Sequence, residues 1–143
     1  AMEYRKFGSD YVVRMDKGEE ILACVEEVCR KEQIRLGSLS GLGAVGAVDL
    51  GVFDTKEFRY RTETYQGDFE IASCTGNIST MDGNTYLHVH AVIANSAKGE
   101  VHGGHLSRGV ISLTGEFVLH AIDGEVDRKY SPEVGLNLIR FEQ

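Results

Sequence analysis

Alternating hydrophobic and polar residues run through most of this chain, and this period of two is typical of β-strands with one buried face. Short turn sequences separate the strand-like segments, among them Gly67-Asp68, Asp82-Gly83-Asn84, Lys98-Gly99 and Asp123-Gly124. Strands are therefore predicted at residues 10–15, 47–53, 58–65, 69–79, 85–95, 102–106, 110–113, 116–122, 126–130 and 136–141.

A helical pattern interrupts the strands at about residues 17–33. Asp16 is predicted to be the N-cap, with Glu19 in the capping-box position three residues later. Glu20 and the other charged residues of this segment are expected to face water. Apolar residues recur at the spacing of a helix face that packs on a core, namely at Ile21, Leu22, Val25, Val28 and Cys29.

One helix among eight or more strands, joined mostly by short turns, predicts an α+β fold built on a largely antiparallel sheet. A length of 143 residues suits a single domain, which we expect to span residues 2–143. No apolar run approaches the roughly 20 residues of a membrane helix, so no membrane partner is expected. The first residues lack the apolar core of a signal peptide, and Ala1 before Met2 resembles an expression remnant.

Glycines cluster in the segment Gly41-Leu42-Gly43-Ala44-Val45-Gly46, at the spacing of a dinucleotide-binding loop. That motif requires a helix that begins at the glycines, whereas the predicted helix precedes them and the following residues are strand-like. The segment is therefore interpreted as a tight connection between strands with close backbone packing, and no nucleotide cofactor is predicted.

The chain is acidic, with 15 lysine and arginine residues against 22 aspartates and glutamates and a formal net charge of −7. Nonspecific binding to nucleic acid draws on basic side chains that replace counterions along the phosphates, so this balance argues against it. The short basic clusters, such as Arg128-Lys129, each adjoin acidic residues and are interpreted as solvated surface.

Three cysteines, Cys24, Cys29 and Cys74, form an odd set without the spacing of paired thiolate ligands. Neither a disulfide framework nor a thiolate zinc site is predicted. Cys24 and Cys29 lie on or beside the apolar face of the helix, so they are interpreted as packing residues and not as nucleophiles. A reducing, cytoplasmic location is expected.

Histidines concentrate in one stretch, because four of the five lie within the eighteen residues from His88 to His105. His88 and His90 are two positions apart, so on a strand both side chains point to the same face. A hairpin that returns past the Lys98-Gly99 turn brings a third imidazole beside them. The sequence Gly103-Gly104-His105 favours a ligand set, because glycines allow close backbone approach. Three neutral imidazoles on a rigid sheet suit a divalent metal, most often zinc.

The remaining candidate side chains have weaker patterns. His102 is three positions from His105, so on a regular strand it points to the opposite face, unless the two glycines form a bulge. His120 is interpreted as a structural residue without a partner. Glu70 and Glu100 are candidate partners for imidazole N–H groups, with an ordinary exposed carboxylate as the alternative.

Four short motifs follow one another along the chain: Gly67-Asp68-Phe69-Glu70-Ile71, Thr75-Gly76-Asn77-Ile78-Ser79, His88-Val89-His90 and Gly103-Gly104-His105-Leu106. In this order they resemble the plants and prokaryotes conserved (PPC) domain family in its stand-alone prokaryotic form, and the resemblance extends over nearly the whole chain, from Tyr11 to Phe141. The resemblance implies an α+β fold, a homotrimer, and a bound metal, expected to be zinc, at His88, His90 and His105. Such members are often labelled predicted DNA-binding proteins by analogy with plant relatives that carry a separate AT-hook, and no Arg-Gly-Arg-Pro hook occurs in this sequence.

Three functions remain open from the sequence. The first is a homotrimeric metal-binding protein whose histidine site is structural or binds a small molecule. The second is a metal-dependent enzyme, since three protein ligands and an open fourth position also describe catalytic zinc, although no carboxylate stands at a spacing that marks a general base. The third is a DNA-associated regulator, which the family label favours and the net charge opposes.

Overall fold

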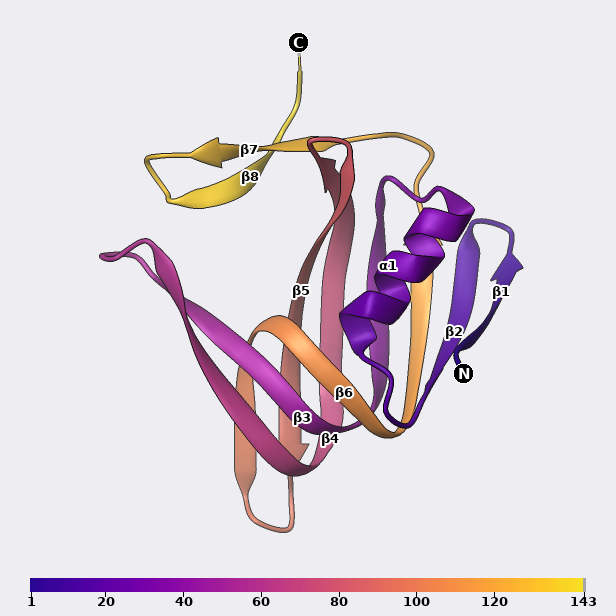
Figure 1. Ribbon diagram of the computed structural model, residues 1–143, viewed down its shortest axis with the longest axis vertical. Coiled ribbons are helices and arrows are strands. Elements are labelled where there is room, and N and C mark those ends of the chain that lie inside the picture. The colour runs from indigo at the N-terminus through magenta and orange to yellow at the C-terminus, as the bar shows by residue number, and fades with distance from the viewer. Residues whose placement is uncertain (143) are drawn as a thin grey trace.

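The computed structural model describes residues 1–142, so residue 143, the last of the predicted domain 2–143, lies outside the described residues. Within this range no helix has both the length and the apolar character needed to cross a membrane. Figure 1 shows the elements in chain order: β1 (Glu3–Phe7), β2 (Asp10–Asp16), α1 (Ile21–Glu32), β3 (Gly37–Asp54), β4 (Arg59–Met81), β5 (Asn84–Asn95), β6 (Glu100–Ala121), β7 (Asp127–Ser131) and β8 (Leu136–Arg140).

The strands form one sheet in which β3, β4, β5 and β6 pair around a closed circuit. β3 pairs with both β4 and β6, and β5 pairs with the same two strands elsewhere along their length. The β1–β2 hairpin extends the sheet from β6, and the β7–β8 hairpin extends it from β4. Every pairing is antiparallel except the contact between Thr80 and Asp127, so the predicted α+β class is confirmed.

Helix α1 lies across β5 and β6 and covers the core from one side (Figure 1). Its buried side chains are Ile21, Cys24, Val25, Val28 and Cys29, which matches the predicted stripe except that Cys24 replaces the partly buried Leu22. All three cysteines are free and buried, and burial raises the pKa of Cys24 to about 11 and those of Cys29 and Cys74 to about 12. They are packing residues, as predicted for the two in the helix.

The predicted start of the helix is wrong. Asp16 is the last residue of β2, and the N-cap is Glu20, whose carboxylate accepts hydrogen bonds from the backbone N–H groups of Leu22 and Ala23. The Glu19 carboxylate does accept from the Asp16 N–H at 2.8 Å, as in a capping box, but no helix begins there. Backbone hydrogen bonds join residues 18–20 to β6, because Gly18 donates to the Ile111 carbonyl and Ile111 donates to that of Glu19.

Two glycine segments predicted as connections are bends within continuous strands. Gly67-Asp68 lies inside β4, and the Gly41–Gly46 segment lies inside β3. Register shifts between Gly41 and Gly43 and between Val45 and Ala47 mark bulges in the β3–β4 pairing. At Gly43 the backbone φ is 141°, and a Cβ atom would lie 2.0 Å from the Thr114 carbonyl oxygen, so only glycine fits. The close packing was predicted correctly, but the chain does not reverse.

Strand β6 is likewise one element, whereas the sequence predicted three short strands between residues 102 and 122. Strand β1 was not predicted, because three of its five residues are charged and its pattern resembles a surface loop. The turns at Asp82-Gly83 and Lys98-Gly99 are confirmed, with positive φ at Asp82, Gly83 and Gly99.

The cap provides a test of how α1 is fixed to the sheet. The Glu20 carboxylate accepts from three backbone N–H groups, those of Leu22, Ala23 and Gly109 of β6. We expect Glu20→Ala to lower the free energy of unfolding by about 1–2 kcal/mol, because these donors lose their acceptor. Urea denaturation measures the change. Glu26→Ala, on the exposed face of the same helix, is the matched control and should stay within about 0.5 kcal/mol. Equal effects of the two substitutions would contradict this role of Glu20.

Candidate metal centre

Strand β5 places His88 and His90 on one face of the sheet. The alternation is regular, since Val89 and Ala91 between and after them are buried while His88 is half-buried and His90 is exposed. Both imidazoles therefore lie on the side of β5 that faces away from the core. The predicted shared orientation of this pair is confirmed.

Strand β6 brings His105 directly opposite His90 in an unbroken antiparallel register. The same residue pairs with Gly51 of β3 on its other side, so the imidazole stands where β6 passes from one neighbour to the other. A Cβ atom on Gly104 would lie 2.6 Å from the Gly51 carbonyl oxygen, so β3 and β6 approach too closely for any side chain there. This confirms the expected role of one of the two glycines before His105.

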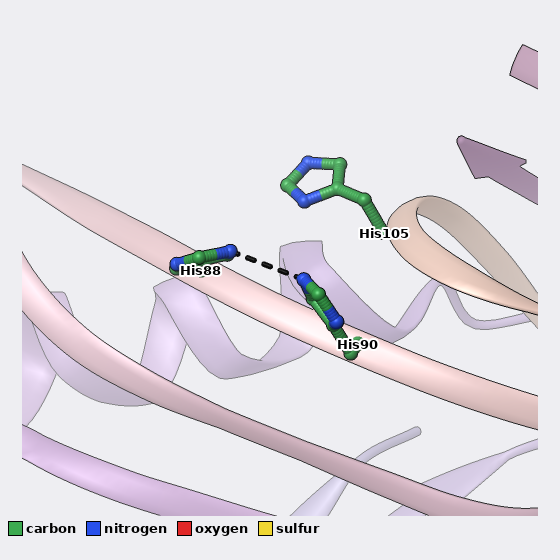
Figure 2. Close-up of side chains that lie close together, drawn as sticks. All are labelled: His88, His90 and His105. Carbon is green, nitrogen blue, oxygen red and sulfur yellow. Dashed lines mark hydrogen bonds between the residues drawn. The ribbon is translucent and has the colours of Figure 1, made fainter. Parts of the chain in front are cut away.

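The three imidazoles of His88, His90 and His105 converge, and one nitrogen of each lies within 4.8 Å of the others (Figure 2). The Nε2 atoms of His88 and His90 are 3.2 Å apart. Two nitrogens bound to one tetrahedral zinc ion at roughly 2.0–2.1 Å lie about 3.3 Å apart, so this pair is already at a zinc-like separation. No two of the three ligand nitrogens are more than 4.8 Å apart, so none of these distances exceeds the zinc-bound value by more than about 1.5 Å. Rotation of the side chains can close such a difference.

The electrostatics of the cluster favour neutral imidazoles. Burial lowers the pKa of His88, and the nearby positive charges of His90 and Arg128 lower it further. Burial also lowers the pKa of His105, with smaller contributions from His88 and His90. Neutral imidazole is the form that binds a metal, so no proton needs to be displaced at neutral pH.

One nitrogen of the cluster lacks a hydrogen-bond partner. The Nδ1 atom of His105 is buried and makes no hydrogen bond within residues 1–142. Buried polar atoms are almost always paired, because an unpaired one costs about 1–3 kcal/mol. A buried nitrogen without a partner beside two further imidazoles is free to bind a metal, so the donor set fits a divalent metal such as zinc.

The other predicted side chains lie outside the cluster. His102 pairs with Ile93 in the same regular register, so no bulge forms and its side chain is on the opposite face from His105. Its ring stacks on Tyr65 with the centroids 3.9 Å apart, and its Nε2 is 3.2 Å from the Glu100 carboxylate. Glu100 is therefore a partner of His102 and not of the three converging imidazoles.

Glu70 and His120 also have different surroundings from those predicted. Glu70 lies on β4 opposite Ala94, and within residues 1–142 it makes no hydrogen bond to a histidine. His120 lies outside the cluster, as its structural interpretation implied, but it does have a partner, because its Nδ1 lies 2.8 Å from the Asp10 carboxylate on β2. The pairing of β2 with β6 creates that contact across 110 residues of sequence.

Sequence reasoning missed Arg128, which was interpreted as solvated surface. Its side chain is only 9% exposed, and it lines a pocket together with His88 and His105. Tyr60 also lines this pocket and stacks on the His105 ring with the centroids 4.5 Å apart. The candidate site thus consists of three convergent imidazoles and an adjoining pocket with a buried guanidinium.

Comparisons with known proteins place this fold. The model of the Plants and Prokaryotes Conserved domain matches residues 2–123. A candidate DNA-binding protein from Bacteroides thetaiotaomicron, known from its crystal structure, is 34% identical in sequence to this chain. The match covers 99% of each chain with a TM-score of 0.94. A metal-containing protein from Archaeoglobus fulgidus is 27% identical, with 99% of each chain covered and a TM-score of 0.86.

A plant- and prokaryote-conserved protein from Pyrococcus horikoshii is 27% identical over 100% of this chain and 96% of that chain, with a TM-score of 0.84. Among curated protein sequences, none matches this chain. The match to the family model covers most of the chain, and the structural matches extend over nearly all of it. We conclude that this protein belongs to the Plants and Prokaryotes Conserved domain family.

Proposed function

We propose that this protein is a homotrimeric zinc-binding protein in which His88, His90 and His105 hold the metal and the site has a structural or small-molecule-binding role. The observation that carries the proposal is the convergence of three imidazole nitrogens within 4.8 Å, one of them buried without a partner. The metal-containing relative from Archaeoglobus fulgidus supports it. Three buried, free thiols suit a reducing compartment, so the cytoplasm is part of the proposal.

Three protein ligands leave the fourth position of a tetrahedral zinc ion for water, a neighbouring subunit or a small ligand. When bound there, zinc supplies Lewis acidity and lowers the pKa of a bound water. A hydrolytic enzyme also needs a general base within reach, and no carboxylate of residues 1–142 belongs to the cluster or to the lining of the pocket beside it. Binding is therefore favoured over catalysis.

Exposed apolar side chains support self-association. Leu113 is 76% exposed, and three further aliphatic residues are more than half exposed on β3 and β6, namely Leu42, Val52 and Val101. Association of identical chains is a common way to cover such side chains, and the family resemblance sets the expected number at three.

DNA binding is not part of the proposal. The Bacteroides thetaiotaomicron relative is described as a candidate DNA-binding protein, and that description belongs to the relative. This chain has a formal net charge of −7. Four of its exposed arginines already form ion pairs with carboxylates, namely Arg14, Arg35, Arg59 and Arg61. Such paired side chains release few counterions on contact with phosphates.

The choice of ligands can be tested by substitution. We expect His90→Ala to lose most of the bound zinc, because two imidazoles alone hold the metal much more weakly. The fold should persist, since the His90 side chain is exposed. Zinc content is measured by mass spectrometry on protein purified without a histidine tag. His120→Ala, also exposed, is the matched control and should keep the wild-type zinc content. Stoichiometric zinc in His90→Ala would show that the ligands are different.

Zinc retention should depend on pH with a defined sign. Protons compete with the metal for imidazole nitrogens, and the pKa values of His88 and His105 lie below the ordinary value of 6.5. These histidines are thus neutral above that pH and become protonated only below it. We expect full occupancy from pH 8 to about 6.5 and release at lower pH, measured after dialysis. Loss of zinc between pH 8 and 7 would contradict the proposed environment.

The assembly can be measured directly. Light scattering at micromolar concentration is expected to give three times the chain mass of 15.7 kDa. The same measurement on the zinc-free protein tells whether the metal contributes to the assembly. A stable monomer of the zinc-loaded protein at that concentration is the outcome that contradicts the proposed trimer.

A further inference from the structure

A pocket of about 270 Å³ lies beside the three imidazoles. One wall comes from the end of the β3–β4 hairpin, at Phe53, Phe58 and Tyr60, and the opposite wall comes from the β7–β8 hairpin. Figure 1 shows both hairpins projecting to the same side of the sheet, away from α1. His88 and His105 also line this pocket, so the pocket and the proposed metal centre share side chains.

Arg128 on β7 is the buried charge of this pocket. Its Nε donates to the Ser79 hydroxyl at 2.8 Å, its Nη1 donates to the Asn137 carbonyl at 2.9 Å, and its Nη2 donates to the Asn77 side-chain oxygen at 2.8 Å. Its guanidinium carbon also lies 4.7 Å from the centre of the Tyr86 ring. These contacts hold the guanidinium firmly, but every one of them is to a neutral group.

A buried charge normally has an ionised partner. None of the ion pairs within residues 1–142 includes Arg128, although its neighbour in the chain is Asp127. The Asp127 carboxylate is engaged elsewhere, because it accepts a hydrogen bond from the Thr80 hydroxyl. The three hydrogen bonds of Arg128 use three of the five N–H groups of its guanidinium, so two N–H groups remain for an anion.

The rest of the lining is free of acidic side chains, although the chain contains 22 of them. Besides Arg128 and two histidines, the lining includes Arg59 and a group of aromatic side chains, namely Phe53, Phe58, Tyr60, Tyr86 and Tyr130. Phe53 packs edge-on against Tyr60 with the centroids 5.2 Å apart, and Tyr60 stacks on His105. The pocket thus offers one buried cation and a continuous aromatic wall.

We propose that this pocket binds a small organic acid with a planar ring, its carboxylate at Arg128 and its ring against the aromatic wall. The inference builds on the proposed metal centre, because His88 and His105 line the same pocket. Arginine is suited to this role, since its planar guanidinium forms paired, charge-assisted hydrogen bonds with a carboxylate. The volume is near the lower limit for small-molecule sites, so a single ring is the expected size.

Three probes of graded chemistry test the inference on the zinc-loaded, full-length protein. Benzoate has the charge and the ring, benzamide keeps the ring without the charge, and acetate keeps the charge without the ring. Binding is measured by calorimetric titration up to roughly millimolar concentration, where single-ring ligands bind. We expect benzoate to bind at least about tenfold more tightly than either of the others, because it alone uses both features. Equal binding of benzamide and benzoate, or no benzoate binding at all, overturns the inference.

Two substitutions locate the site. Arg128→Gln should weaken benzoate binding about tenfold or more and remove the preference over benzamide, because the charge is lost. Arg140→Gln removes the same charge from an exposed position on β8 outside the pocket lining and should leave binding unchanged. Leu138→Trp adds a large ring at a partly exposed position of the lining that is not itself a hydrogen-bond partner of Arg128, and it should also abolish binding. If Arg128→Gln does not fold, Leu138→Trp alone tests whether benzoate binds in this pocket.

Zinc content measured in the same samples separates this inference from the proposed function. Protein that holds zinc through the three histidines but binds benzoate no better than benzamide overturns the pocket inference alone. Protein without zinc that still prefers benzoate, and loses the preference in Arg128→Gln, supports the pocket inference and overturns the metal centre. Benzoate binding that survives in both Arg128→Gln and Leu138→Trp places the ligand elsewhere and overturns the inference.

Discussion

The register between β5 and β6 is the constraint on which the site depends. His90 stands opposite His105 because the turn at residues 96–99 closes with Gly99 at a φ of 67° and sets the pairing of every following residue. Side chains alternate between faces, so a slip of one residue would turn His105 toward the core and Leu106 toward solvent. Burial prevents the slip, because Leu106 and Ile93 are almost fully enclosed. The core thus fixes the geometry of a site on the opposite face.

The residue pattern within each segment made much of the fold predictable. Most features that were predicted wrongly depend on pairing between strands that are distant in the sequence. The period of two along β5 is a local property, so the orientation of His88 and His90 followed from the sequence. Whether a glycine is a turn or a bulge depends on its partner strands. Gly67 lies in β4 opposite a β3 segment with its own register shift, and the chain bends there without reversing. The helix start was misplaced for the same reason, because the hydrogen bonds of Gly18 and Glu19 to Ile111 hold these residues on β6.

The burial of Arg128 could not be predicted from the local sequence pattern. This residue stands between Asp127 and Lys129 in a strand of five residues, too short for alternation to distinguish a buried position from an exposed one. Its burial comes from contacts with Ser79 and Asn77 on β4, about fifty positions earlier in the chain. The adjoining Asp127 looked like a charge partner in sequence, yet on a strand consecutive side chains point to opposite faces. Only the parallel contact of β7 with β4 reveals that the guanidinium and the carboxylate are separated.

The positive charge of this site has a consequence for what it binds. Burial is the main cause of the lowered pKa of His88, and the nearby positive charges of His90 and Arg128 lower it further, so another positive charge near that imidazole is disfavoured. A divalent metal at the three histidines meets the same repulsion, and in a partly buried site it is only weakly screened. An anion at Arg128 would offset the guanidinium and the metal at once. Metal and carboxylate would therefore each strengthen the binding of the other by the same factor, because such coupling is reciprocal.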